Sequence, residues 1–154
     1  MPRAVCVGEC MIELVPALGD LWSMQVGGDC YNVAVYLARS GIDTAFLTAL
    51  GADRYSAWMR EVWAGEHLDL SLVATIAERH PGLYAISTDD AGERSFTYWR
   101  DQSAARALFA ASDIDALLER AAHADLLYLS GITLSLFDEA GQARLRALAR
   151  TVRA

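Results

Sequence analysis

Two glycines precede a helix signal in the stretch Gly27-Gly28-Asp29-Cys30-Tyr31-Asn32-Val33-Ala34. Apolar residues then recur at helical spacing as far as Ala38,. Glycines at such a position let backbone N–H groups approach a ligand closely, and the N-terminus of a helix attracts anionic or hydroxyl oxygen. We therefore predict a helix that begins after residues 27–29 and is capped by Gly41, with Asn32 in its first turn.

Short apolar segments on both sides of this helix are typical of buried strands. They cover residues 4–9, 44–50 and 125–130, and each is continuous in hydrophobicity rather than alternating,. Further helices are expected after Asp53, from Ser112 and after residue 130. Strands that alternate with helices in this way indicate an α/β fold with a mostly parallel sheet covered by helices.

Two polar and aromatic segments interrupt this alternation. Residues 10–26 and 83–100 carry turn signals, so we predict a hairpin in each and a small β-structured appendage over one end of the sheet,. In the second hairpin, Asp89-Asp90-Ala91-Gly92 fits a type I turn followed by a G1 bulge, with a three-residue loop at 90–92. This loop pairs Tyr84 with Tyr98 and places Arg100 on the same face, whereas a two-residue loop sends Tyr98 and Arg100 to the other face.

The composition excludes several classes of function. The 154 residues include 54% hydrophobic and 21% charged residues, which is typical of one globular domain with a buried core,. The net charge is −7, so nucleic acid is not an expected partner,. All 13 basic residues are Arg, and without Lys the chain has no P-loop,. The first apolar segment is too short for a signal peptide or a membrane span, so we expect a cytoplasmic protein with no membrane partner.

The cysteines and histidines give no sign of a metal site. Cys6, Cys10 and Cys30 are odd in number and contain no Cys-x-x-Cys pair, so we expect free thiols in a reducing cytosol,. The three histidines are scattered, and no metal ligand is assigned among His67, His80 and His123,.

The spacing of the paired glycines, Asn32, a small residue, Gly41 and Gly51 resembles the N-terminal signature of ribokinase-like sugar kinases. Cys30 departs from that signature, since many members carry Gly, Ala or Pro there. Five further blocks resemble bacterial 2-keto-3-deoxygluconate kinases: Val7-Gly8-Glu9-Cys10-Met11-Ile12-Glu13-Leu14, Thr48-Ala49-Leu50-Gly51, Pro81-Gly82-Leu83-Tyr84, Gly92-Glu93-Arg94-Ser95-Phe96-Thr97-Tyr98-Trp99-Arg100 and Tyr128-Leu129-Ser130-Gly131-Ile132.

The resemblance implies a three-layer α/β ribokinase-like core in which residues 1–154 form the N-terminal half of the kinase domain. Lid segments at about 10–27 and 82–100 are then expected to cover the sugar and to pair in a homodimer. The resemblance assigns sugar binding to six residues: Gly28, Asn32, Tyr84, Tyr98, Arg100 and Ile132. ATP and Mg²⁺ are the implied co-substrates. The Gly-x-Gly-Asp motif that carries the catalytic base in this family does not occur in the sequence, so we expect an inactive chain that binds neither ATP nor Mg²⁺.

The chemistry of these residues agrees with a sugar acid as the ligand. Arg100 is the first choice for the acid group, because a guanidinium binds a carboxylate with two parallel hydrogen bonds. Tyr84 and Tyr98 each offer a ring to stack on the carbon skeleton and a hydroxyl to bond to it, or they only pack the hairpin. Glu13 is a secondary candidate for the sugar hydroxyls, and the alternative is a solvated strand residue.

Three functions stay open on the sequence alone. The chain is part of a kinase, a stand-alone module that binds a sugar acid without catalysis, or a dimerisation module built on the lid. Within the kinases, the alternative substrate is a neutral sugar such as fructose. That alternative leaves Arg100 without a carboxylate to pair with.

Overall fold

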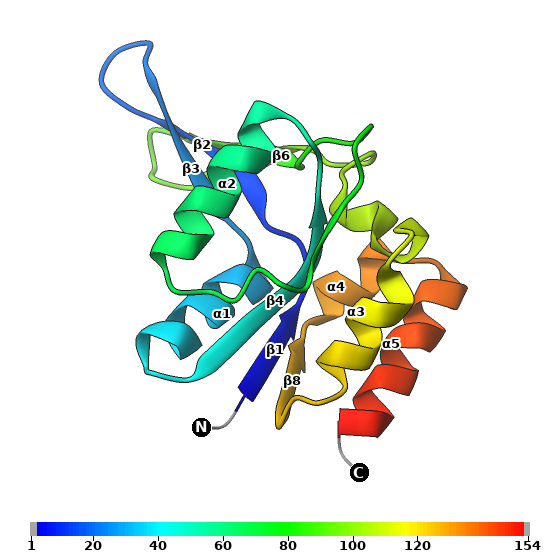
Figure 1. Cartoon of the computed structure of the whole chain (residues 1–154). Coiled ribbons are helices and arrows are strands. Elements are labelled where there is room, and N and C mark those ends of the chain that lie inside the picture. Colours follow the sequence, from blue (N-terminus) through cyan, green and yellow to red (C-terminus); the bar gives the residue numbers. More distant parts are fainter. Residues whose placement is uncertain (1–2, 153–154) are drawn as a thin grey trace.

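Four parallel strands form the central sheet of the computed structural model, which describes residues 3–152 (Figure 1). Their order is β5-β4-β1-β8. They run over β1 (Arg3–Val7), β4 (Asp43–Leu50), β5 (Val73–Thr75) and β8 (Leu126–Leu129). Every pairing in this sheet is parallel, which confirms the sheet expected from the continuous apolar segments,.

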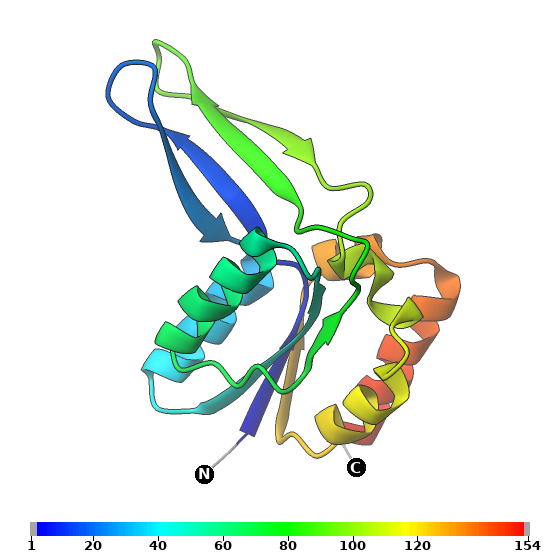
Figure 2. The same ribbon diagram turned by 45° about the horizontal axis from the view of Figure 1, so that its top comes forward.

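Helices cover both faces of this sheet (Figure 2). One face carries α1 (Asp29–Arg39) and α2 (Arg54–Gly65), and the other carries α3 (Ile114–Ala121) and α5 (Glu139–Val152). Successive residues of β1 therefore point to different cores: Cys6 packs with Phe46 and Trp63 on the first side, while Val5 and Val7 pack on the second,. The expected three-layer α/β core is confirmed.

The C-terminal end of α1 is set by a local signal in the sequence, the glycine at position 41. Gly41 has a φ of 83°, in the left-handed region that favours glycine,. Its N–H donates to the carbonyl of Ala38 at 2.9 Å, and the N–H of Ile42 donates to the carbonyl of Leu37 at 3.1 Å. This pair of bonds is the Schellman motif that commonly ends a helix. The predicted C-terminal cap at Gly41 is confirmed.

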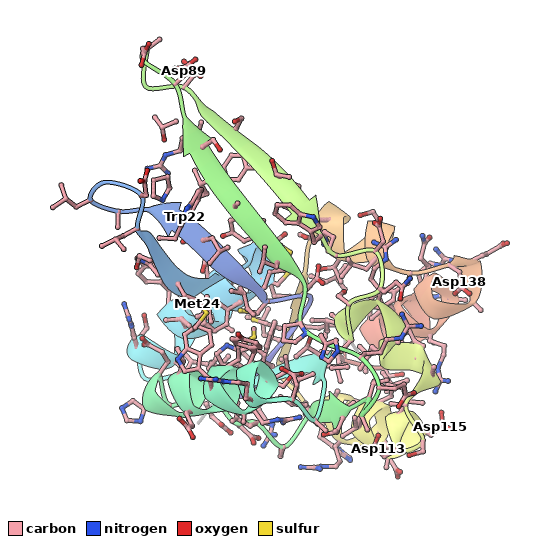
Figure 3. The ribbon with its side chains drawn as sticks, turned by 90° about the horizontal axis from the view of Figure 1, so that it is seen from above. Trp22, Met24, Asp89, Asp113, Asp115 and Asp138 are labelled. Carbon is pink, nitrogen blue, oxygen red and sulfur yellow. The ribbon has the colours of Figure 1, made fainter. Side chains whose placement is uncertain are left out.

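A second, four-stranded sheet stands beyond one end of the central sheet (Figure 2). It consists of two hairpins in the order β3-β2-β6-β7 and is called the lid here. The first hairpin is β2 (Met11–Pro16) with β3 (Trp22–Gly27), and the second is β6 (Leu83–Thr88) with β7 (Arg94–Trp99). Figure 3 shows Trp22 and Met24 along β3 and Asp89 at the tip of the second hairpin.

The turn of the second hairpin has the predicted three-residue loop. The N–H of Asp89 donates to the carbonyl of Glu93 at 3.0 Å, and the φ of Gly92 is 84°,. Tyr84 is therefore the partner of Tyr98 in the ladder, and Ile86 is the partner of Phe96. The predicted register is confirmed.

Two short helices were not predicted, and two helix boundaries differ from expectation. The 3₁₀ helix η1 (Ala105–Ala110) precedes α3, which begins after Asp113 rather than at Ser112. After β8, the expected single helix is divided into α4 (Gly131–Leu136) and α5. Phe137 has extended backbone angles, and the carboxylate of Asp138 then accepts from the N–H of Gly141 at 2.9 Å, which restarts the helix,.

Within residues 3–152, no helix is both long and apolar enough to cross a membrane. The same residues contain no group of three His, Cys, Asp or Glu side chains placed to hold a metal ion. Cys6, Cys10 and Cys30 are buried free thiols.

Candidate functional site

The carboxyl ends of β1 and β8 meet at the place where the strand order changes direction. From β1 the chain proceeds to β4 and β5 on one side and later adds β8 on the other side. Ligands of open α/β sheets bind at such a switch point. A cavity of about 290 Å³ lies there, between the lid and the N-terminal ends of α1 and α4.

All six residues assigned to sugar binding line this one cavity: Gly28, Asn32, Tyr84, Tyr98, Arg100 and Ile132. They come from α1 and the residue before it, from the second hairpin of the lid, and from α4. The structure thus brings together residues from three separate parts of the chain. Their role in binding stays a prediction. A larger cavity of about 770 Å³ lies beside η1, α4 and α5, and none of the six lines it.

Three aromatic rings of the second hairpin form one wall of the cavity. The ring centroids of Tyr84 and Tyr98 are 5.7 Å apart, and those of Phe96 and Tyr98 are 6.3 Å apart. Tyr84 is only 8% exposed, whereas Tyr98 is 50% exposed. The first tyrosine is therefore part of the packing of the lid, whereas half of the surface of the second remains exposed. Phe96 was not among the predicted site residues, although the register that places Tyr98 in the cavity also places Phe96 there.

Arg100 lies at the end of this aromatic wall and already has a protein partner. Its Nη2 is 2.5 Å from Oε2 of Glu9, and its guanidinium carbon lies 5.8 Å from the centre of the Tyr98 ring. The side chain of Arg100 is 19% exposed and lines the cavity, while its Nε is buried without a hydrogen-bond partner. The prediction of Arg100 as a ligand-binding cation therefore needs one addition: Glu9 neutralises part of its charge.

Glu9 is a further cavity residue that sequence reasoning missed. It is the second residue after the end of β1, lines the cavity and is only 4% exposed. Burial raises the pKa of its carboxyl, and this effect outweighs the opposing influences of Ser103, Arg100 and Arg106,. A charged residue close to the carboxyl end of a buried parallel strand is the signal that could have identified it, because ligands bind at the carboxyl ends of such strands.

Glu13 contacts Tyr84 and is not part of the cavity lining. The hydroxyl of Tyr84 donates to Oε2 of Glu13, and burial together with this carboxylate raises the pKa of Tyr84. Gly27 makes this contact possible, since a Cβ at that position would collide with the Tyr84 hydroxyl. Glu13 is therefore neither a cavity residue nor a fully solvated one; it orients Tyr84.

The N-terminus of α1 forms the floor of the cavity. Gly28 caps the helix, and the N–H of Asn32 donates to its carbonyl at 2.8 Å. A Cβ on Gly28 would lie 3.1 Å from Cα of Cys10 and closer still to the carbonyl oxygen of Glu9, so only glycine fits. Asn32 is exposed in the first helical turn and lines the cavity, where its amide is available to a hydroxyl,.

Helix α4 brings Ile132 to the mouth of the cavity. The N–H of Thr133 donates to the side chain of Ser130 at 3.2 Å, which caps the helix. The hydroxyl of Thr133 donates to the carbonyl of Val7 at 2.9 Å and so ties the helix to β1. Ile132 itself remains half exposed and gives the cavity an apolar contact.

Residues 1–153 match the family described as pfkB family carbohydrate kinase. The 2-dehydro-3-deoxygluconokinase of Dickeya dadantii is 41% identical over 96% of this chain and 49% of its own length. That of Escherichia coli K12 is 41% identical over 99% of this chain and 50% of its own length. A fructokinase of Salmonella typhimurium is 30% identical over 60% of this chain. The chain thus spans about half the length of the 2-dehydro-3-deoxygluconokinases that it matches.

Solved structures with a similar fold agree with this match. A PfkB protein from Polaromonas superposes with a TM-score of 0.84 at 23% identity, over 99% of this chain and 52% of that protein. The 2-dehydro-3-deoxygluconokinase of Thermotoga maritima superposes with a TM-score of 0.81 at 23% identity, over 99% of this chain and 48% of that protein. At this level of identity the likeness supports the fold.

Proposed function

Because the chain belongs to the pfkB family of carbohydrate kinases, we propose that it forms the sugar-binding half of a kinase that phosphorylates 2-keto-3-deoxygluconate. This sugar acid is the 2-dehydro-3-deoxygluconate named in its relatives. One observation carries the proposal: the cavity at the switch point of the sheet combines a guanidinium, aromatic rings and an amide. A sugar acid needs all three kinds of group.

Each part of the acid has a partner of suitable chemistry in this cavity. The guanidinium of Arg100 pairs with the carboxylate, since a guanidinium and a carboxylate have matching planar geometry,. The ring of Tyr98 packs against the carbon chain, and Asn32 binds hydroxyls from the N-terminal end of α1,.

ATP and Mg²⁺ are co-substrates in the proposed reaction, and the residues described here do not fit them. The sequence contains no Lys for a P-loop and no Gly-x-Gly-Asp motif,. Within residues 3–152, no three Asp, Glu, His or Cys side chains are placed so that they could hold a metal ion. We therefore assign no step of phosphoryl transfer to these residues. They bind and orient the acceptor, which is one of the two requirements of that reaction.

A fructokinase-like activity is the second candidate, and two observations favour it. The fructokinase relative shares 30% identity with this chain. In addition, Glu9 already neutralises part of the charge of Arg100, which lowers the attraction of the cavity for an anion,.

Calorimetric titration of the purified chain separates the two candidates. We expect 2-keto-3-deoxygluconate to bind at least tenfold more tightly than D-fructose, and Arg100→Ala to remove that preference. Equal affinity for the two sugars would reject the sugar-acid proposal in favour of a neutral substrate.

We also propose that the lid pairs with the lid of a second copy and that the protein acts in the cytoplasm. Support for the first comes from exposed apolar side chains on the lid, among them Leu21, Trp22 and Trp99,. Trp22, for example, is 52% exposed. Support for the second comes from the three free thiols, which suit a reducing compartment,.

A further inference from the structure

The ion pair between Glu9 and Arg100 is enclosed on one side by backbone. A Cβ on Gly82 would lie 2.8 Å from Oε1 of Glu9 and 3.1 Å from Cβ of Arg100. Gly82 immediately precedes β6, and Arg100 immediately follows β7, so the base of the second hairpin fits tightly around the pair. A side chain at position 82 would therefore displace one or both members of the pair.

Two contacts fix the guanidinium of Arg100 from different directions. Oε2 of Glu9 is 2.5 Å from Nη2, and the Tyr98 ring lies 5.8 Å from the guanidinium carbon. The side chain of Glu9 is only 2% exposed, whereas that of Arg100 is 19% exposed. Glu9 is therefore the more deeply buried partner of a pair in which both residues line the cavity.

Burying this carboxylate is unfavourable, since burial raises the pKa of Glu9 despite the nearby guanidinium groups of Arg100 and Arg106,. A buried ionisable group that lines a cavity and costs stability is a candidate for a role in binding. An arginine side chain is long and flexible, and ordering it when the ligand arrives lowers the affinity. A partner that orders it beforehand removes that loss.

We propose that Glu9 is a positioning residue, which holds Arg100 in the orientation that receives the carboxylate of the sugar acid. This inference rests on the proposed function, because it takes the ligand to be an anion. Glu9 acts through Arg100 and does not itself bind the sugar. The opposing effect is repulsion between the Glu9 carboxylate and the incoming anion. The two effects predict changes of opposite sign when Glu9 loses its charge, so one substitution distinguishes them.

The test compares the unmodified chain with Glu9→Gln and with Glu119→Gln as the matched control. Glu119 is an exposed residue of α3, so the control removes the same charge away from the cavity. Calorimetric titration with 2-keto-3-deoxygluconate should show about tenfold weaker binding for Glu9→Gln and no change for Glu119→Gln. Binding to Glu9→Gln that equals or exceeds that of the unmodified chain would overturn the inference and leave the proposed function intact.

A second measurement needs no ligand and reports the orientation of Arg100 directly. The heteronuclear NOE of the Arg100 Nε–Hε group should show a rigid side chain in the unmodified chain and in Glu119→Gln, and a mobile one in Glu9→Gln. If the unmodified chain binds no sugar acid, the proposed function fails, and the NOE still decides whether Glu9 orders Arg100. An unchanged NOE in Glu9→Gln would overturn the positioning role.

Discussion

The hydroxyl of Tyr84 donates a hydrogen bond to Glu13, although these residues lie 71 positions apart in the chain. They are direct partners in the parallel pairing of β2 with β6, so the contact joins the two hairpins of the lid. It also orients a ring that lines the cavity. The carboxylate of Glu13 thus contributes to the site by way of Tyr84, across a strand pairing that no local pattern specifies.

We predict that Tyr84→Phe weakens sugar-acid binding by about 1 kcal/mol, or roughly fivefold. The substitution retains the ring and removes the hydroxyl, so Glu13 loses its partner and the ring loses its fixed orientation. Calorimetric titration measures the change, with Tyr36→Phe as the control, because Tyr36 is exposed on α1. Unchanged affinity in Tyr84→Phe would show that the hydrogen bond only stabilises the lid.

Arg100→Lys should weaken sugar-acid binding by about 1–2 kcal/mol even though it retains the positive charge. Lys lacks the planar fork that holds Glu9 and a ligand carboxylate at the same time,. Arg146→Lys is the matched control, since Arg146 is exposed on α5 and does not line this cavity. If Arg100→Lys binds as tightly as the unmodified chain, charge alone accounts for recognition of the acid.

The raised pKa of Glu9 predicts a pH-dependent effect of Glu9→Gln on stability. The folded state disfavours the ionised carboxyl of Glu9, so the protonated form stabilises the fold. This contribution to the free energy of unfolding is fully present below the pKa of about 4.3 that Glu has in the unfolded chain, and it is lost as the pH rises through the higher pKa of the folded state. Glu9→Gln should therefore raise the melting temperature at pH 8, and the difference should shrink as the pH falls toward 4. A lower melting temperature than that of the unmodified chain at pH 8 would show that the ion pair with Arg100 is net stabilising.

The purified chain of 154 residues should not transfer phosphate from ATP to 2-keto-3-deoxygluconate. Phosphoryl transfer depends on groups that hold the nucleotide and stabilise the transferring phosphoryl group. The Gly-x-Gly-Asp motif that carries the base in this family is not in the sequence. A coupled assay on protein of verified mass provides the measurement. Turnover well above the blank would mean that the catalytic groups lie among the residues described here.

The chain should self-associate through the free edge of β8, and Leu126→Lys should reduce that association. β8 is an outer strand of the central sheet, and Leu126 is 47% exposed on it. An exposed apolar edge pairs readily with other chains, and Lys on an edge strand opposes such pairing. Sedimentation at increasing concentration compares Leu126→Lys with Tyr55→Lys, whose side chain is 44% exposed on α2, outside both the lid and β8. A stable monomer of the unmodified chain at high concentration would contradict the prediction.

Much of the fold was predictable because its signals are local. The three-residue loop of the second hairpin follows from Asp89 and Gly92, and it fixes which face of the hairpin carries Tyr84, Tyr98 and Arg100,. The predicted end of α1 follows from Gly41, and the start of α2 follows from Asp53, whose carboxylate accepts from two N–H groups of the first turn,. The short helices η1 and α4 were missed, since each is only six residues long and too short for a clear periodic pattern,.

The sequence by itself therefore determined the α/β class, the two hairpins, the register of the second hairpin and six of the residues that line the cavity. The tertiary structure alone decided that Glu9 pairs with Arg100, that Glu13 pairs with Tyr84, and that Glu13 stays outside the cavity lining. The physical reason is the range of the interactions. Turns, caps and amphipathic periods depend on residues a few positions apart, whereas these ion pairs and hydrogen bonds depend on which strands become neighbours. Strand order is set by packing the whole chain around one core, and no short stretch of sequence encodes it.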